Sequence, residues 1–277
     1  MRLPSFVLGL AVVLALSPGC DCDDDAPPPG TTPGMDSGTT TGGDGSITGS
    51  LDSPFTVSPG GEVLCGDTPC ACDDGMDNDG DGTVDGLDAE CTGPYDNDEG
   101  TFATGIPGDN RDPYWQDCFF DGNSGGGDDG CRYNTCCLYA DQRDNPDCAD
   151  RGRCDVSDMC RTYCLARTPS GCDCFGCCNV PTADGGSVSI LIGGTCDLEN
   201  IADETACPRC VQTPDCMNEC GTCELCVGRT VADLPPECTP DAGTPMYTCD
   251  TGTVCMTDAE CPMDYFCQLG CCAPFII

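Results

Sequence analysis

Thirty-two cysteines in 277 residues constrain this chain more than any other feature. Leu, Ile, Val and Phe together account for only 43 residues, and nine of these lie within the first sixteen. Burying so few apolar side chains cannot offset the conformational entropy of the chain, so a composition of this kind would otherwise indicate disorder. A high cysteine content reverses that expectation and is typical of a disulfide scaffold. We therefore predict small disulfide-rich modules, mostly irregular, with short β-strands and little helix.

The cysteines beyond residue 62 fall into four groups with an even number in each. They comprise four from Cys65 to Cys91, twelve from Cys118 to Cys178, eight from Cys196 to Cys238, and six from Cys249 to Cys272. Even groups favour local closure and allow fifteen bridges, although spacing does not give the connectivity. In a cytosolic protein, C-x-x-C units such as Cys207 to Cys210 would indicate zinc sites, whereas in a secreted chain they indicate disulfides.

The N-terminus has the features of a signal peptide. Arg2 precedes an apolar run from Phe6 to Leu16, which is too short to span a bilayer, and small residues follow up to Gly19. Cys20 in this position resembles the lipidated cysteine of bacterial lipoproteins, and plain secretion is the alternative. Both imply an extracytoplasmic protein, either an outer-membrane lipoprotein or a secreted one. A lipid at Cys20 would provide the only attachment to a membrane.

The segment from 20 to 62 is dominated by Pro, Gly, Thr, Ser and Asp and predicts a disordered tether. Its r.m.s. span is roughly 35 Å. The run Ser187 to Ile192, between two glycine pairs, is the clearest strand, with no evident partner. The resulting division is a signal peptide at 1–19, a tether at 20–62, a calcium-binding loop module at 63–100, and cysteine-rich modules at 101–180, 181–240 (with the strand) and 241–277.

The formal net charge of −38 excludes several classes of function. Such a polyanion is repelled by nucleic acids and by anionic membrane surfaces. The chain has no His, which removes the common zinc sites and the Ser-His and Cys-His catalytic pairs. Among 48 acidic residues no catalytic carboxylate pair stands out. We therefore expect a protein that is not an enzyme.

The stretch DNDGDGTVDGLD, residues 77–88, has the ligand spacing of a calcium-binding loop. Carboxylates occupy positions 1, 3, 5, 9 and 12, Gly82 occupies the sharp turn at position 6, and position 7 offers a backbone carbonyl. A solvated acidic loop is the simpler alternative, but random acidic runs do not keep this period. The predicted Ca²⁺ ligands are Asp77, Asp79, Asp81, Thr83, Asp85 and Asp88.

The flanks of this loop do not have the amphipathic pattern of EF-hand helices. The loop more closely resembles those of thrombospondin type 3 and dockerin repeats. Cys72 and Cys91 bracket it and are candidates for a bridge worth roughly 3 kcal/mol on the chain-entropy estimate. Extracellular calcium modules have dissociation constants on the order of 0.1 to 1 mM, which suits a structural ion.

Two further features lie between residues 94 and 131. Asp121, Asn123 and Asp128 could contribute to a second ion site, but intervening glycines break the ligand period and favour an ordinary turn. An aromatic group is expected to form a small satellite core, with a binding surface as the alternative; its members are Tyr114, Trp115, Phe119 and Phe120.

The string CDDGMDNDGDGTVDGLDAEC followed by PYDNDE resembles the metal-binding motif of cysteine-rich bacterial secreted proteins and lipoproteins. Downstream, QDCFFDGNSGGGDDGC and GCDCFGCC are similar to an uncharacterised set within that group. The resemblance implies calcium at the loop acids and an extracytoplasmic location, with no reaction. We expect a non-enzymatic surface or secreted protein with an adhesion, interaction or envelope-structural role and a protein or polysaccharide partner.

The last module, CMTDAECPMDYFCQLGCC from Cys255 to Cys272, suggests the main alternative. It resembles part of a whey-acidic-protein four-disulfide core and also Dickkopf-like cysteine modules. This resemblance implies a secreted protease inhibitor acting through the C-terminal module, although no inhibitory loop can be assigned.

Overall fold

The structure is a computed structural model that describes residues 55–58, 63–105, 114–120, 130–143, 148, 154–182, 184–238, 247–249, 253–263 and 265–274. By its contacts the chain divides at residue 39, and every described residue belongs to the unit from 40 to 277. The expected signal peptide, Cys20, most of the tether and the acids from Asp121 to Asp128 lie outside the described ranges. Within those ranges, no helix has the length and apolar character needed to cross a membrane.

Fifteen disulfides join all thirty cysteines from Cys65 to Cys272, as predicted. Cys72 pairs with Cys91 around the acidic loop. The C-x-x-C cysteines Cys207 and Cys210 are each bridged to a different partner, so neither is available as a zinc ligand. The first and last of the four groups close on themselves.

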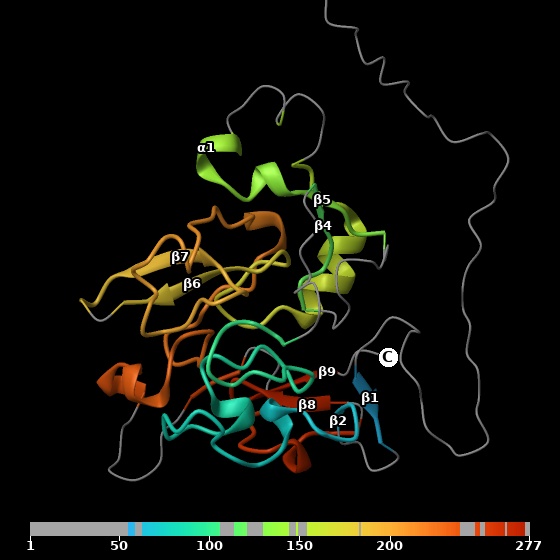
Figure 1. Ribbon diagram of the computed structural model, residues 1–277, viewed down its shortest axis with the longest axis vertical. Coiled ribbons are helices and arrows are strands. Elements are labelled where there is room, and N and C mark those ends of the chain that lie inside the picture. Colours follow the sequence, from blue (N-terminus) through green and yellow to red (C-terminus); the bar gives the residue numbers. More distant parts are fainter. Residues whose placement is uncertain are drawn as a thin grey trace, which may run out of the picture. The chain divides into compact units, whose positions relative to one another are not determined.

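The second and third cysteine groups do not close separately. Two bridges, Cys174–Cys216 and Cys177–Cys210, connect them across the boundary expected at residues 180 and 181. The physical reason is the pairing of β6 (Cys177–Pro181) with β7 (Ser187–Leu191), which places the two sides of that boundary in one sheet (Figure 1). The bridges therefore close within 118–164, within 172–216 and within 220–238, and the expected boundary falls inside the middle one of these three sets.

The predicted strand at Ser187 to Ile192 is confirmed as β7, and its partner is β6. The antiparallel register runs from Cys177 opposite Leu191 to Pro181 opposite Ser187. In the connecting turn, Thr182 N–H donates to the Gly186 carbonyl at 3.0 Å, and Gly185 has a φ of +82°, a conformation that favours glycine. The outer edge of β7 is covered, because Cys210 N–H donates to the Ser189 carbonyl at 3.1 Å.

The remaining regular structure is short, in agreement with the predicted fold class. Antiparallel pairs also form between β1 and β2, β2 and β3, β4 and β5, and β8 and β9. The strands are β1 Phe55–Val57, β2 Val63–Cys65, β3 Thr68–Pro69, β4 Trp115–Gln116, β5 Tyr133–Asn134, β8 Tyr265–Gln268 and β9 Cys271–Pro274. The helical turns are η1 Ala71–Asp73, η2 Asp85–Leu87, η3 Thr135–Cys137, α1 Ala140–Arg143, η4 Cys160–Cys164, η5 Leu165–Arg167, η6 Pro214–Cys216, η7 Val231–Asp233, η8 Pro236–Cys238 and η9 Asp258–Glu260.

Half-cystines supply much of the buried surface. In one of the two larger core clusters, ten of the fifteen buried residues are cysteines, packed around Tyr133 and Phe175, whose rings stack at 4.2 Å. The other cluster holds Phe119 and Phe120. The expected aromatic satellite is therefore only partly correct, since Tyr114 and Trp115 are exposed by 73% and 37%. Disulfide sulfur here occupies space that aliphatic side chains fill in ordinary domains.

The segment from 63 to 100 is attached to the rest of the described chain by hydrogen bonds, because both of its bridges are internal. Gly270 N–H donates to the Gly86 carbonyl at 3.0 Å, and the Gln268 side chain donates to the Thr92 carbonyl at 2.6 Å. Leu198 N–H donates to the Glu90 carboxylate at 2.9 Å. These contacts fix the acidic loop against both the central region and the C-terminal hairpin β8–β9.

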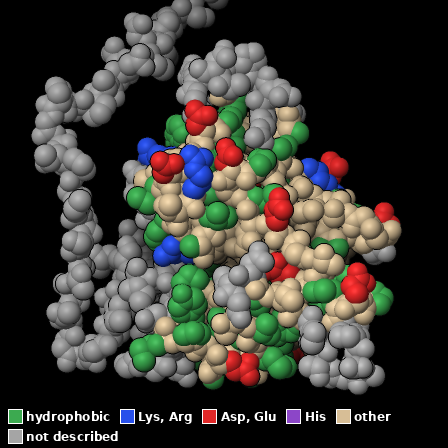
Figure 2. All heavy atoms as spheres, turned by 180° about the vertical axis from the view of Figure 1, so that it is seen from behind, with side chains coloured by type: hydrophobic (Ala, Val, Ile, Leu, Met, Phe, Trp, Pro, Cys, Tyr) green, Lys and Arg blue, Asp and Glu red, His purple; other side chains and the backbone are tan. Residues whose placement is uncertain are grey.

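The surface does not gather the negative charge into one patch on the face drawn in Figure 2. There, acidic side chains stand singly or in small groups among hydrophobic and uncharged ones.

Removing a disulfide that crosses the boundary expected at residues 180 and 181 should destabilise the protein more than removing a disulfide that closes a short loop. The double change Cys177→Ser and Cys210→Ser opens a loop of 33 residues and should lower the unfolding free energy by about 4 kcal/mol. The control Cys65→Ser with Cys70→Ser opens only 5 residues and should cost about 2 kcal/mol. Guanidinium denaturation measures both; equal losses would contradict the inferred role of the cross-boundary bridge.

Candidate metal centre

The acidic loop from 77 to 88 follows the helical turn η1 and includes η2 near its end, within the ring closed by Cys72–Cys91. Its backbone turns twice through left-handed glycines, with φ of +85° at Gly80 and +103° at Gly82. The Asp77 carboxylate accepts hydrogen bonds from the N–H groups of both glycines, at 2.7 and 3.2 Å. Glycine at position 6 thus serves the turn that the loop spacing predicts.

Two overlapping triads of acids form around this turn. One oxygen each from Asp77, Asp79 and Asp81 lie within 4.8 Å of one another, and these side chains are exposed. A second triad, whose oxygens also lie within 4.8 Å of one another, consists of Asp79, Asp88 and Glu99. Since Asp79 belongs to both, the structure brings five carboxylates to one place.

Asp88 closes the loop from a fully buried position. One of its oxygens accepts from Glu90 N–H at 2.7 Å, and the other accepts from the Thr83 hydroxyl at 2.8 Å. The same hydroxyl oxygen lies 2.6 Å from an Asp81 oxygen, so its single proton is shared between the two acids. Burial, reinforced by the neighbouring acids, raises the pKa of Asp88 to about 6. Thr83, predicted as a backbone ligand, contributes its side chain by tying two of the acids together.

Glu99 is the site residue that sequence reasoning missed. It is only 2% exposed, and its carboxylate accepts from Asp85 N–H at 2.9 Å and from Asn78 N–H. Burial first, and then the charges of Asp88 and Asp85, raise its pKa to about 7. The acidic run from Asp96 to Glu99 is visible in the sequence, but Glu99 lies eleven residues beyond the loop, where no ligand spacing points to it.

Asp85 is placed differently from the other predicted ligands. Its carboxylate accepts from Asp74 N–H at 3.1 Å and from Gly75 N–H at 2.9 Å, at the entrance of the loop, and it belongs to neither triad. Asp85 is itself in the left-handed region with φ of +47°. The free N–H groups at the end of η1 therefore hold this side chain away from the turn.

The donor set is chemically uniform. Five carboxylates and a hydroxyl offer oxygen only, which suits a hard divalent cation such as Ca²⁺ and not a metal that prefers nitrogen or sulfur. In the part of the chain that the structure describes, the arginine–carboxylate ion pairs lie elsewhere, at Arg161–Asp158 and Arg209–Glu204. The mutual repulsion of the five acids is thus not relieved by a described side chain.

A second pair of acids joins the loop segment to the C-terminal module. Asp73 and Asp258 interact through their side chains, and a shared proton would relieve the repulsion between them. Asp73 also accepts from Val63 N–H at 2.9 Å, and Asp258 accepts from Cys267 N–H at 2.6 Å. Burial, and then the charge of Asp258, raises the pKa of Asp73 to about 8, and burial also raises the pKa of Asp258.

This pair predicts that the metal-free protein becomes less stable as pH rises. Between about pH 4 and pH 8 the folded chain keeps a proton at Asp73 that the unfolded chain has lost, so the unfolding free energy falls across this window. The other buried acids act in the same direction. Urea denaturation in chelator at pH 6 and pH 8.5 measures the effect.

Asp258→Asn should reduce this pH dependence, because it removes the repulsion and keeps an oxygen for Cys267 N–H. The exposed Asp215→Asn provides a control with the same change in net charge. A pH dependence that is the same in Asp258→Asn and Asp215→Asn would rule out the shared proton as its source.

Comparison with protein-family models, curated proteins and solved structures finds no match to this chain. A functional inference must therefore come from the chemistry of the residues themselves. The feature most informative about function is the cluster of five carboxylates from Asp77, Asp79, Asp81, Asp88 and Glu99.

Proposed function

We propose that the protein is a non-enzymatic, calcium-binding, disulfide-stapled protein of the cell surface or the extracellular space, with a role in adhesion or envelope structure. The observation that carries the proposal is the convergence of Asp79, Asp88 and Glu99 beside Asp77 and Asp81. Fifteen disulfides are consistent with an oxidising compartment outside the cytoplasm. Ca²⁺ is preferred because the loop spacing and the all-oxygen ligands both favour it.

The role proposed for the ion is structural. Two of the acids, Asp88 and Glu99, are almost fully buried, and burying a carboxylate among like charges is costly unless a cation or a proton neutralises it. Calcium would cancel this repulsion and fix the loop through the same groups. Because Gly86 in the loop bonds Gly270 of the β8–β9 turn, and Glu90 just after the loop bonds Leu198, the stabilisation would spread beyond the loop itself.

In this proposal, presentation at the cell surface would depend on the N-terminal segment. A lipid at Cys20 would make the segment from 20 to 62 a stalk that holds the cross-linked region away from the membrane. A protein or polysaccharide partner could then be bound by that region. Secretion without lipid is the alternative, and intact-protein mass spectrometry separates the two by the mass at the mature N-terminus.

Calcium should raise the stability of the protein by roughly 1.4 kcal/mol when its concentration is ten times the dissociation constant. The expected dissociation constant is on the order of 0.1 to 1 mM. Calorimetric titration and thermal melting with calcium or chelator test this. Identical melting curves together with no heat of binding would refute the proposal.

The triads also predict which variants lose the ion. Asp79→Asn, which affects both triads, and Glu99→Gln, which lies outside the loop, should each weaken calcium binding at least about tenfold. Asp67→Asn is the control, because Asp67 is an exposed acid in the β2–β3 turn and carries the same charge. Equal affinity for Glu99→Gln and Asp67→Asn would remove Glu99 from the ligand set.

A further inference from the structure

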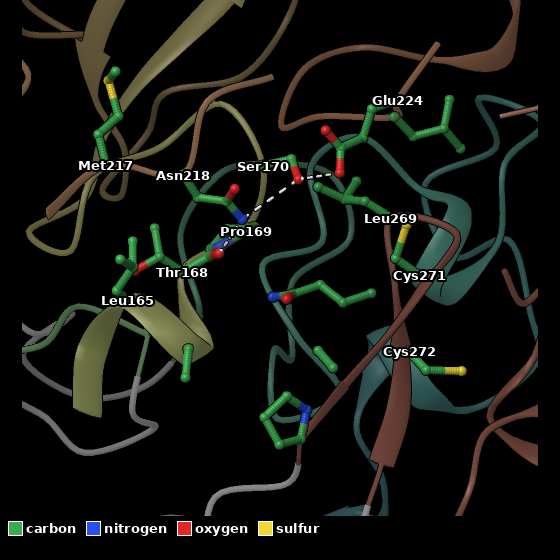
Figure 3. A pocket seen from close by; sticks show the side chains of 15 residues that line it. Leu165, Thr168, Pro169, Ser170, Met217, Asn218, Glu224, Leu269, Cys271 and Cys272 are labelled. Atoms are coloured by element: carbon green, nitrogen blue, oxygen red, sulfur yellow. Dashed lines mark hydrogen bonds between the residues drawn. The ribbon is translucent and has the colours of Figure 1, made fainter. Parts of the chain in front are cut away.

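Figure 3 shows a cavity of about 260 Å³, and none of the residues that line it belongs to the acidic loop. Three segments form it: residues 165 to 170, residues 217 to 225, and residues 268 to 274 of the β8–β9 hairpin. Most of its wall is apolar, from Leu165, Pro169, Leu225, Leu269 and Pro274. The volume and lining fit a short apolar stem of a few carbon atoms.

Five polar side chains also line the cavity: Thr168, whose hydroxyl donates to the Cys164 carbonyl, and Ser170, Asn218, Glu224 and Gln268. Figure 3 shows Ser170, Asn218 and Glu224 turned toward one another. The Ser170 hydroxyl donates to one Glu224 oxygen at 2.8 Å, and Gly221 N–H donates to the other at 2.8 Å. Glu224 is therefore held in a fixed position although it is only 3% exposed.

Most of the donors of these side chains are already used by the protein. The Asn218 amide nitrogen donates to the Thr168 carbonyl at 2.9 Å, and the Gln268 amide nitrogen donates to the Thr92 carbonyl at 2.6 Å. Among the described residues, nothing donates to the amide oxygens of Asn218 and Gln268. What the cavity can still offer a ligand is mainly hydrogen-bond acceptors, namely the two amide oxygens and one carboxylate, beside the second N–H of the Gln268 amide.

The charge of Glu224 is also without an ion pair in the described part of the chain. The nearest arginine in sequence is Arg229, whose guanidinium donates to the backbone carbonyls of Gly221, Thr222 and Glu224. The chain has no Lys that could serve instead. A buried carboxylate with no ion pair, in a cavity that also offers two amide oxygens, favours a ligand that is both cationic and rich in N–H donors.

We propose that this cavity binds an organic cation, a primary ammonium or guanidinium group on a short apolar stem. Glu224 would neutralise the charge, Asn218 and Gln268 would accept N–H hydrogen bonds, and the leucine and proline wall would cover the stem. The same chemistry occurs in free alkyl amines and in lysine or arginine side chains of a peptide. The proposal does not depend on calcium, since its residues are separate from the two triads.

The test is an NMR titration of the full chain with n-butylammonium and, separately, its neutral analogue 1-butanol, in physiological salt and saturating calcium. We expect saturable shifts at the amides of Asn218, Gly221 and Leu269 with the cation, and at least tenfold weaker binding of the alcohol. N-acetyl-lysine amide distinguishes the sources: binding as tight as that of butylammonium indicates that a peptide-borne side chain is accommodated, and exclusion indicates a free amine. Equal binding of the alcohol, or shifts that do not saturate, would overturn the proposal.

Variants separate the site from general attraction to a polyanion. Glu224→Gln should weaken butylammonium binding at least tenfold and keeps an oxygen for the Ser170 hydroxyl. Glu219→Gln, an exposed acid nearby, makes the same change in net charge and should leave the affinity within twofold. Ala273→Leu should also abolish binding, because it fills the cavity and leaves the carboxylate in place. Wild-type affinity in a folded Glu224→Gln or Ala273→Leu protein, with no free thiols by mass, would refute the assignment.

Discussion

Fifteen covalent cross-links are the constraint on which the rest of this structure depends. They hold together a chain whose sheets have two or three short strands and whose one α-helix in the described residues has four residues. By limiting the unfolded ensemble they supply stability that so few aliphatic side chains could not. Their sulfur atoms also fill the core around Tyr133 and Phe175. Cysteine therefore acts here both as the staple and as the main buried apolar residue.

Once cross-links fix the backbone, buried acids become tolerable. Asp173, fully buried, accepts three backbone N–H groups from Phe175, Cys177 and Thr213, and burial raises its pKa to about 7. The Asp96 carboxylate likewise accepts hydrogen bonds from the N–H and hydroxyl of Thr92 and from Asp98 N–H. Carboxylates thus organise irregular backbone that no sheet or helix satisfies. Asp79, Asp88 and Glu99 differ from these, because three acids share one space, which is costly unless a cation or a proton neutralises them.

The sequence predicts the number of disulfides and the clearest strand better than it predicts which distant segments meet. Cysteine number predicted the bridges, and glycine-flanked β-branched residues predicted the strand at Ser187. No local sequence pattern predicts the contacts between segments that are distant along the chain. Pairing of Cys174 with Cys216, and the arrival of Glu99 beside Asp88, depend on how irregular loops meet in space. Asp85 is the converse case: it has the ligand spacing, but its carboxylate accepts hydrogen bonds from the nearer N–H groups of Asp74 and Gly75.

The C-terminal hairpin connects the two proposed sites. Its Gly270 N–H binds the Gly86 carbonyl in η2, just after the acidic turn, while Gln268 lines the cavity and donates to Thr92. Both contacts lie within a few residues of Asp88. An ion that orders the loop would therefore also hold Gln268 and Leu269 in place. The hairpin has few other restraints, because so little of the surrounding chain is in regular secondary structure. Calcium and an organic cation would then favour the same arrangement of the hairpin, so that each would strengthen binding of the other.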